Sequence, residues 1–173
     1  MLSHMNIRQA TINDLPGLAD LWQERMVIIG QIDPRFAQNI VDLETWIAQE
    51  KERIQANNWQ IIAAKKDDTV IGYIAGYIQT SLVGNGEETN QCGIIEEIVL
   101  DAHTYHSGLG RGLYTAIMTW FDAQDIQQIL IKSPRYYAVE QAFWRALGAK
   151  EWLPKRGESS NWNVSPGCIW MTL

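Results

Sequence analysis

Apolar residues recur along this chain at two spacings, and each spacing predicts a type of secondary structure. A return every three or four positions gives a helix one apolar face, whereas a short run of Ile, Val, Ala and Tyr is typical of a strand. The helical spacing occurs in four segments: 15–26, 43–54, the stretch that follows Gly110, and 137–147. The strand pattern occurs in seven: 7–10, 59–65, 70–78, 93–100, 128–132, 150–153 and 168–173.

The connections between these segments predict how the strands pair. A polar turn at 66–69 joins two strands and predicts an antiparallel hairpin. A helix separates the strands 93–100 and 128–132, as in a β-α-β unit with parallel strands. The pattern therefore predicts an α/β fold with one sheet of mixed strand direction.

Two further segments interrupt the pattern. Asp33-Pro34 breaks the chain between the first two helices. Residues 81–93 are polar and contain Gly84-Asn85-Gly86, so we expect a mobile loop there.

Composition and charge favour one domain over residues 1–173 and exclude several partners. The chain has 173 residues, of which 46% are hydrophobic, enough for one core. Its formal net charge of -6 argues against nucleic acid and anionic membranes as partners. The longest apolar run, 70–78, is about half of the roughly 20 residues that a membrane-spanning helix needs. Residues 1–5 lack the pattern of a secretory signal and could be an expression-tag remnant.

Cysteine and histidine are sparse. Cys92 and Cys168 are far apart and form no CxxC pair, and the three histidines show no HExxH spacing. We therefore expect reduced thiols, a cytoplasmic location and no metal site.

One segment combines a strand, a glycine-bearing turn and the start of a helix. It runs from the strand 94–100 through Gly108 and Gly110 to Leu113. The first N–H groups of a helix lack partners within the helix and the helix dipole adds partial positive charge, so such a turn suits a phosphate or pyrophosphate. Two other phosphate motifs fail, because GxGxxG would need glycine in place of Leu113 and no GxxxxGK[ST] sequence occurs.

The turn is similar instead to the pyrophosphate loop of the GNAT acyltransferases, written (Arg/Gln)-x-x-Gly-x-(Gly/Ala). Here the loop is Tyr105-His106-Ser107-Gly108-Leu109-Gly110, five positions after the apolar Leu100. Residues 7–14, 71–73 and 143–149 look like further landmarks of the family, so the resemblance covers nearly the whole chain. It implies a mixed, mostly antiparallel seven-stranded sheet with about four helices on its two faces.

The resemblance also implies an activity and a set of site residues. Members transfer an acetyl or similar acyl group from acyl-CoA to a primary amine, so we expect an acetyl-CoA-dependent N-acetyltransferase. The backbone of the strand end would bind the pantetheine arm and the loop would wrap the pyrophosphate. The expected cofactor-binding residues are Ile98, Val99, Leu100, His106, Ser107, Gly108, Leu109, Gly110, Arg111 and Tyr137.

Two carboxylates interrupt the apolar strand before the loop. Glu96 and Glu97 are adjacent, so regular strand geometry puts them on opposite faces, and at most one can face the acyl group. We predict Glu96 as the catalytic base, nine positions before Tyr105, where some family members carry one. A carboxylate flanked by Ile and Val should accept a proton from an ammonium group more readily. Glu97 is the second candidate, and the alternative for both is an ion-paired or exposed residue.

The chain departs from the family at two positions. Trp144 stands where many members have the tyrosine that protonates the CoA thiolate, and an indole cannot act as that acid. Tyr136 and Tyr137 lie about two turns earlier and either could substitute. We predict Tyr137, with water as a further alternative. Tyr105 replaces the usual Arg or Gln of the loop, and Arg111 could restore the positive charge.

Eight tryptophans are many for a chain of this length. Four occupy helix faces and are expected in the core or in a dimer contact: Trp22, Trp46, Trp120 and Trp144. Four lie in or near strands and the late loop, where one or two could wall an acceptor pocket: Trp59, Trp152, Trp162 and Trp170.

The acceptor itself is not defined by the sequence beyond a small-molecule or peptide amine. The family suggests a homodimer. An alternative function is an acyl-CoA-binding regulatory module without efficient turnover, favoured by Trp144 and Tyr105. A third is a scaffold for protein contact that binds no acetyl-CoA.

Overall fold

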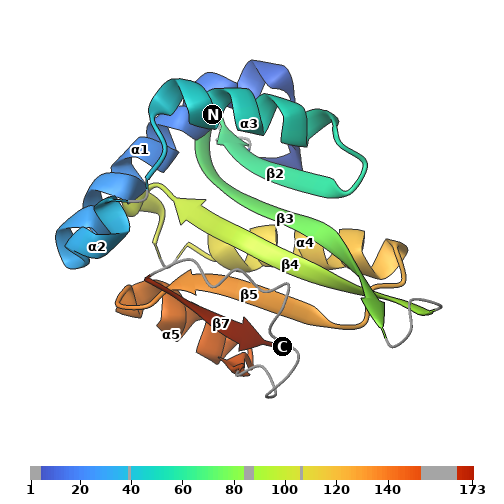
Figure 1. The fold of residues 1–173 in the computed structure, drawn as a ribbon. Helices are drawn as coiled ribbons and strands as arrows, with labels where there is room; N and C mark the ends of the chain where they lie inside the picture. Colours follow the sequence, from blue (N-terminus) through green and yellow to red (C-terminus); the bar gives the residue numbers. More distant parts are fainter. Residues whose placement is uncertain (1–4, 39, 84–87, 106, 153–166) are drawn as a thin grey trace.

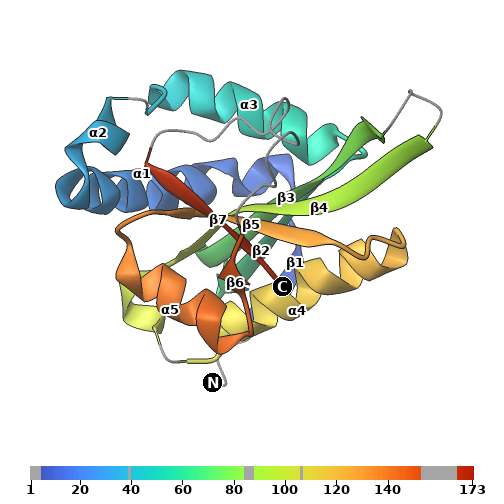
Figure 2. The ribbon, with the colours of Figure 1, turned by 60° about the horizontal axis from the view of Figure 1, so that its bottom comes forward.

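A seven-stranded sheet lies between two layers of helices (Figure 1, Figure 2). The computed structural model describes residues 5–38, 40–83, 88–105, 107–152 and 167–173. Its strands are β1 (Met5–Gln9), β2 (Trp59–Lys66), β3 (Thr69–Val83), β4 (Glu88–Leu100), β5 (Ile129–Pro134), β6 (Lys150–Glu151) and β7 (Cys168–Thr172). Its helices are α1 (Leu15–Ile32), α2 (Pro34–Ala37), α3 (Leu43–Gln55), α4 (Leu109–Ala123) and α5 (Ala138–Ala146), with 3-10 turns η1 (Ile12–Asp14) and η2 (Ala102–Thr104).

The strand order is β1-β2-β3-β4-β5-β7-β6, and every neighbouring pair is antiparallel except β4 and β5. The predicted mixed, mostly antiparallel seven-stranded sheet is confirmed. The described residues form five α-helices, one more than the four segments with helical spacing. In that part of the chain, none of the helices is both long and apolar enough to cross a bilayer.

The additional helix, α2, begins where the Asp-Pro pair was expected only to break the chain. The side chain of Asp33 accepts a hydrogen bond from the backbone N–H of Arg35, and Pro34 occupies the first helical position. Proline is tolerated there because the missing N–H would have no helical partner. The same pair that ends α1 therefore starts the next helix.

The predicted loop over residues 81–93 was wrong for most of its length. β3 continues to Val83 and β4 begins at Glu88, and these two residues are paired. Backbone ladder bonds form whatever the polarity of the side chains, so a polar sequence can form a regular hairpin. Only residues 84–87, at the tip, lie outside the described residues.

Each face of the sheet has its own apolar core. Helices α4 and α5 cover one face, where Leu113, Ile117 and Phe121 are fully buried. Helices α1 and α3 cover the other, where Trp22 and Trp46 are buried. Figure 2 shows the two helical layers on opposite sides of the strands. The 3.6-residue period of each helix supplies the stripe that packs on its face.

The ladder between β4 and β5 is short. Only Gly93, Ile94 and Ile95 pair with β5, at Ile129, Leu130 and Ile131. Beyond these pairs the two strands separate, and Figure 1 shows them diverging toward their carboxyl ends. The sheet therefore opens between residues 96–100 and the end of β5.

Gly93 allows the two strands to meet at the closed end of this opening. A Cβ atom there would lie 2.6 Å from Phe121 and 2.7 Å from Ile129. We predict that Gly93→Ala lowers the free energy of unfolding by about 1–3 kcal/mol through overpacking, measured by urea denaturation.

Gly30→Ala in α1 is the matched control. A Cβ atom there would lie 3.4 Å from Ala37, and alanine favours the helix, so a gain of up to about 1 kcal/mol is expected. Equal effects of the two substitutions would contradict the packing role of Gly93.

Candidate active site

A β-bulge places both carboxylates of β4 on one side of the sheet. Ala75 pairs with Glu97, but the next residue of β3 pairs with Ile95, which leaves Glu96 as the extra residue. Ile95 and Ile98 consequently join the same core, on the α4 face, and both glutamates line one pocket on the other face. The prediction that the two glutamates face opposite sides was wrong, because a bulge breaks the two-residue alternation of a strand.

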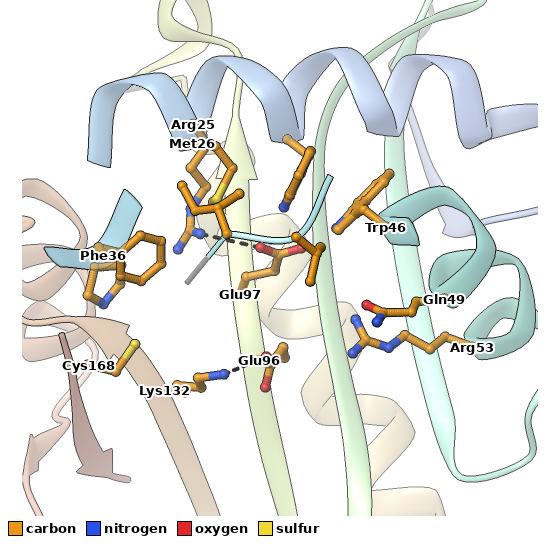
Figure 3. A pocket seen from close by; sticks show the side chains of 14 residues that line it. Arg25, Met26, Phe36, Trp46, Gln49, Arg53, Glu96, Glu97, Lys132 and Cys168 are labelled. Atoms are coloured by element: carbon orange, nitrogen blue, oxygen red, sulfur yellow. Dashed lines mark hydrogen bonds and ion pairs between the residues drawn. The ribbon is translucent and has the colours of Figure 1, made fainter. Parts of the chain in front are cut away.

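The pocket has a volume of about 380 Å³ and lies where β4 and β5 separate, under α1, α2 and α3 (Figure 3). Its aromatic walls are Trp22, Phe36 and Trp46. Its charged lining consists of Arg25, Arg53, Glu96, Glu97 and Lys132. This mixture of apolar walls and a few charged groups is typical of a binding site for a small polar molecule.

Glu97 is held inside a buried network. Its Oε1 atom accepts a hydrogen bond of 2.8 Å from the Tyr73 hydroxyl, and its Oε2 atom lies 3.3 Å from Nη1 of Arg25. Nη2 of Arg25 donates to Glu140 at 2.8 Å, so one guanidinium joins α1, β4 and α5. Burial raises the pKa of Glu97, and Arg25 and Tyr73 oppose that rise. Both oxygens of Glu97 are engaged, which gives it a structural role.

Glu96 is more accessible. Nζ of Lys132, on β5, donates to Oε1 of Glu96 at 2.7 Å, and the two side chains are 22% and 20% exposed, respectively. The ion pair spans the opening just beyond the last β4–β5 pair. Glu96 therefore presents a carboxylate to the pocket from the gap between the strands.

The tryptophans of the pocket are not those expected from the sequence. Among the described residues, Trp22 and Trp46 line it, and their rings stack at 4.9 Å. Both were expected in the core or a dimer contact, and both are indeed buried. Trp162 lies outside the described residues. A helix-face tryptophan can serve the core and the wall of a cavity together because the ring has two faces.

The backbone of β4 is directed into the opening at alternate residues. The N–H of Asp101 donates to the carbonyl of Ile71 in β3, at 3.0 Å. Bonded pairs alternate in an antiparallel ladder, so the backbone polar groups of Val99 also point to β3, whereas those of Ile98 and Leu100 point toward the gap. Of the three strand residues predicted to bind the cofactor, Ile98 and Leu100 can offer backbone hydrogen bonds there.

The start of α4 has the geometry of an anion site. Gly108 caps the helix with φ 83°, and the first helical bond joins the Gly112 N–H to the Gly108 carbonyl at 3.0 Å. The Ser107 hydroxyl donates to the Thr104 carbonyl and accepts from the N–H of Leu109, so it fixes the turn. His106 lies outside the described residues. An anion at a helix N-terminus is bound mainly by the backbone N–H groups of the first turn.

The two glycines of the loop serve different purposes. A Cβ atom on Gly108 would meet none of the described residues within 4 Å, so this glycine is required for its positive φ rather than for close packing. A Cβ atom on Gly110 would lie 3.0 Å from the Phe143 ring, so that glycine allows α4 to pack on α5. Arg111 is exposed at the first turn.

Tyr137 lies at the start of α5, outside the lining of the pocket. Its hydroxyl is 3.3 Å from that of Tyr105, so the two tyrosines join the loop before α4 to α5. Burial raises the pKa of Tyr137, which keeps its hydroxyl protonated at neutral pH. Trp144 is fully buried and its indole N–H donates to Glu140 at 3.4 Å, whereas Tyr136 is exposed.

Sequence analysis missed Arg25, Glu50, Arg53 and Lys132. Two of them carried a signal, since Arg25 and Glu50 stand on the apolar stripes of their helices, where a charge is unusual. The sequence pattern gave no such signal at Lys132 or Arg53. In the described part of the chain, no group of three or more His, Cys, Asp or Glu side chains could hold a metal ion.

Glu50 of α3 is a buried carboxyl group behind the pocket. It is 1% exposed, its Oε1 atom accepts from Nη1 of Arg53, and its Oε2 atom has no hydrogen-bond partner among the described residues. Burial raises the pKa of Glu50 to about 7, and Arg53 opposes that rise. The folded chain therefore holds a proton there that the unfolded chain releases near pH 4.5.

This pKa shift makes the stability of the fold depend on pH. Because the raised pKa favours the protonated folded state, the free energy of unfolding should fall as pH rises from about 4.5 through 7. Relative to Glu50→Gln, we expect wild type to lose about 2–3 kcal/mol between pH 5 and pH 8. Urea denaturation at both pH values measures this, and parallel pH profiles of the two proteins would contradict it.

The fold and site agree with a comparison to known families. A profile of the acetyltransferase (GNAT) family matches residues 20–149. The chain belongs to this family, and the resemblance seen in the sequence is confirmed. No curated protein matched the chain in a sequence search.

Solved structures share the fold at low identity. The aminoglycoside N-acetyltransferase AAC(6')-Iy in complex with CoA is 21% identical, with a TM-score of 0.68 over 90% of this chain and 97% of that chain. The PaiA N-acetyltransferase from Thermoplasma acidophilum, in complex with coenzyme A, is 19% identical, with a TM-score of 0.65 over 98% of each chain. An aminoglycoside acetyltransferase, meta-AAC0020, from an uncultured soil metagenomic sample in complex with sisomicin is 16% identical, with a TM-score of 0.63 over 88% and 93%.

Proposed function

We propose that this protein is a CoA-dependent N-acyltransferase that moves an acetyl or similar acyl group to a primary amine. The observation that carries the proposal is the opening between β4 and β5. This opening contains the pocket, in which Glu96 presents an accessible carboxylate. The N-terminus of α4 follows the end of β4 in the chain. An acyl thioester in that opening would place its carbonyl between an amine in the pocket and the strand backbone.

The residues present suit an acyl-CoA donor. The inward-directed backbone groups of Ile98 and Leu100 match the amides of a pantetheine arm, and residues 107–111 offer helix N-terminal donors for a pyrophosphate. Structures of the family relatives AAC(6')-Iy and PaiA hold CoA, which supports the same donor here. When bound, the donor supplies an activated thioester carbonyl.

Residues of this chain would carry out the proton transfers of the reaction. Glu96 takes a proton from the acceptor ammonium, directly or through water, and thereby frees the nitrogen lone pair. The nitrogen then forms its bond to the acyl carbon as the carbon–sulfur bond breaks, the new amide nitrogen gives up its second proton to water, and the sulfur receives a proton. Tyr137 is the donor proposed from the sequence, and water is the alternative. The raised pKa of Tyr137 keeps its hydroxyl protonated but also makes it a weaker acid.

The acceptor is proposed as a small-molecule or peptide amine. The family relative meta-AAC0020 was solved with sisomicin, which supports a soluble polar amine as one acceptor type. The cytoplasmic location and the homodimer remain predictions from the sequence. No metal is needed, since a thioester is already activated toward amines.

The positive φ of Gly108 offers a test of the donor site. We predict that Gly108→Ala weakens CoA binding about ten- to hundredfold, because a changed φ displaces the N–H donors that should hold the pyrophosphate. Isothermal titration calorimetry with CoA measures this.

Gly148→Ala is the matched control. Gly148 also has a positive φ, 96°, with nothing within 4 Å of an added Cβ, but it follows α5. Both substitutions should cost about 1–2 kcal/mol of stability. If both change CoA affinity equally, the helix N-terminus is not the pyrophosphate site.

Glu96→Gln tests the base. We expect kcat for thiol release from acetyl-CoA to fall about 10²–10⁴-fold, because the amide cannot accept the proton. Glu97→Gln should instead destabilise the fold by about 1–3 kcal/mol, since Arg25 and Tyr73 lose an ionic partner. Full activity of Glu96→Gln beside loss of activity in a folded Glu97→Gln would transfer the role to Glu97.

The alternative function is an acyl-CoA-binding regulatory module, supported by Trp144 at the position of the usual acid. Measuring thiol release in the presence of amines distinguishes this module from an enzyme. Amine-stimulated thiol release supports the enzyme, whereas tight CoA binding without release across a broad amine panel supports the module.

A further inference from the structure

Arg53 is fixed in place at the rim of the pocket. Its guanidinium lies 4.1 Å from the centre of the Trp59 ring, and Trp59 in turn stacks on Tyr77 at 4.5 Å. Its Nη1 atom donates to the buried carboxyl group of Glu50. An indole face and a buried carboxyl group thus hold the side chain from two directions, which removes much of the conformational freedom that an arginine would lose on binding a ligand.

The remaining N–H groups of Arg53 face the pocket. Figure 3 shows Arg53 and Gln49 reaching from α3 into the cavity, toward Glu96 on β4. Within the described part of the chain, Glu50 is the acceptor that Arg53 meets, so the other edge of the guanidinium is available. The fork of an arginine matches the two oxygens of a carboxylate.

The three cations that line the pocket differ in how far their charge is compensated. The other two cations are engaged: Arg25 with Glu97 and Glu140, and Lys132 with Glu96. Arg53 is ion-paired with Glu50, whose pKa of about 7 leaves that carboxyl group partly neutral at physiological pH. Arg53 is therefore the least compensated of the three cations, and its charge extends into the pocket, where it opposes the rise in the pKa of Glu97.

We infer that the acceptor is an amine that also carries a carboxylate, bound with its carboxylate on Arg53 and Gln49 and its amine toward Glu96. The inference rests on the proposed function and specifies its substrate class. A polycationic acceptor would place positive charge against Arg53, which disfavours it. The product would be an N-acylated amino acid, formed by the nitrogen–carbon bond and proton transfer already described.

The test compares acceptors that differ only in the carboxylate. Acetyl-CoA-dependent thiol release is measured for L-α-amino acids and for ω-amino acids of increasing chain length, each beside its own carboxamide, and for spermidine and an aminoglycoside. We expect at least one amino acid to exceed its carboxamide about tenfold or more in kcat/KM, since a charge-assisted arginine contact contributes about that much.

The variants test whether Arg53 causes the preference. Arg53→Gln should bring the ratio of carboxylate to carboxamide close to one, while Arg145→Gln, an exposed arginine of α5 outside the pocket, should leave the ratio unchanged. Because Arg53→Gln strips Glu50 of its partner, the double variant Arg53→Gln/Glu50→Gln is measured too, and it should show the same loss of the ratio.

The outcomes separate the two proposals. Turnover of spermidine, the aminoglycoside or the carboxamides in preference to every amino acid would overturn the substrate class and leave the N-acyltransferase intact. A preference for carboxylates that survives in both Arg53 variants would overturn the role of Arg53. Absence of thiol release with every amine would overturn the proposed function itself.

Discussion

The early end of the β4–β5 ladder is the constraint on which the site depends. After Ile95 and Ile131 the two strands no longer exchange hydrogen bonds, yet β4 stays paired to β3 through Leu100. One edge of β4 is therefore left with backbone donors and acceptors that a bound molecule can use. Parallel neighbours that separate in this way create an opening in the middle of a sheet, with helices on both faces to close its sides.

The bulge in β4 adds the chemistry to this opening. A regular strand would bury one glutamate under α4, among the apolar side chains of that core. The extra residue at Glu96 brings both carboxylates to the face where Arg25 and Lys132 can pair with them. The network of Arg25 is costly to bury, and such groups are retained when geometry rather than stability is the benefit. In this protein, the contacts of Arg25 fix the positions of α1, β4 and α5 relative to one another around the pocket.

Helix α3 also buries a charged group that fixes the position of another side chain. Glu50 is buried at the cost of a raised pKa, and in return it anchors Arg53 against Trp59. A side chain held in this way presents its donors in one direction, as preorganised binding sites do. The pocket thus has ion-paired carboxylates on the sheet and a preorganised arginine on α3.

The sequence by itself determined the order of elements, the two apolar faces, the family and the loop at Gly108, because each depends on local spacing along the chain. Arg25 and Glu50 interrupt apolar stripes of the sequence, but their burial and their partners became evident only in the structure. Only the tertiary structure decided that Glu96 and Glu97 share a face, that Lys132 crosses to Glu96, and that Trp22 and Trp46 wall the pocket. These facts depend on the register between strands and on contacts between distant segments. Register is a property of two strands together, and a one-residue shift in it reverses the faces of the side chains beyond it.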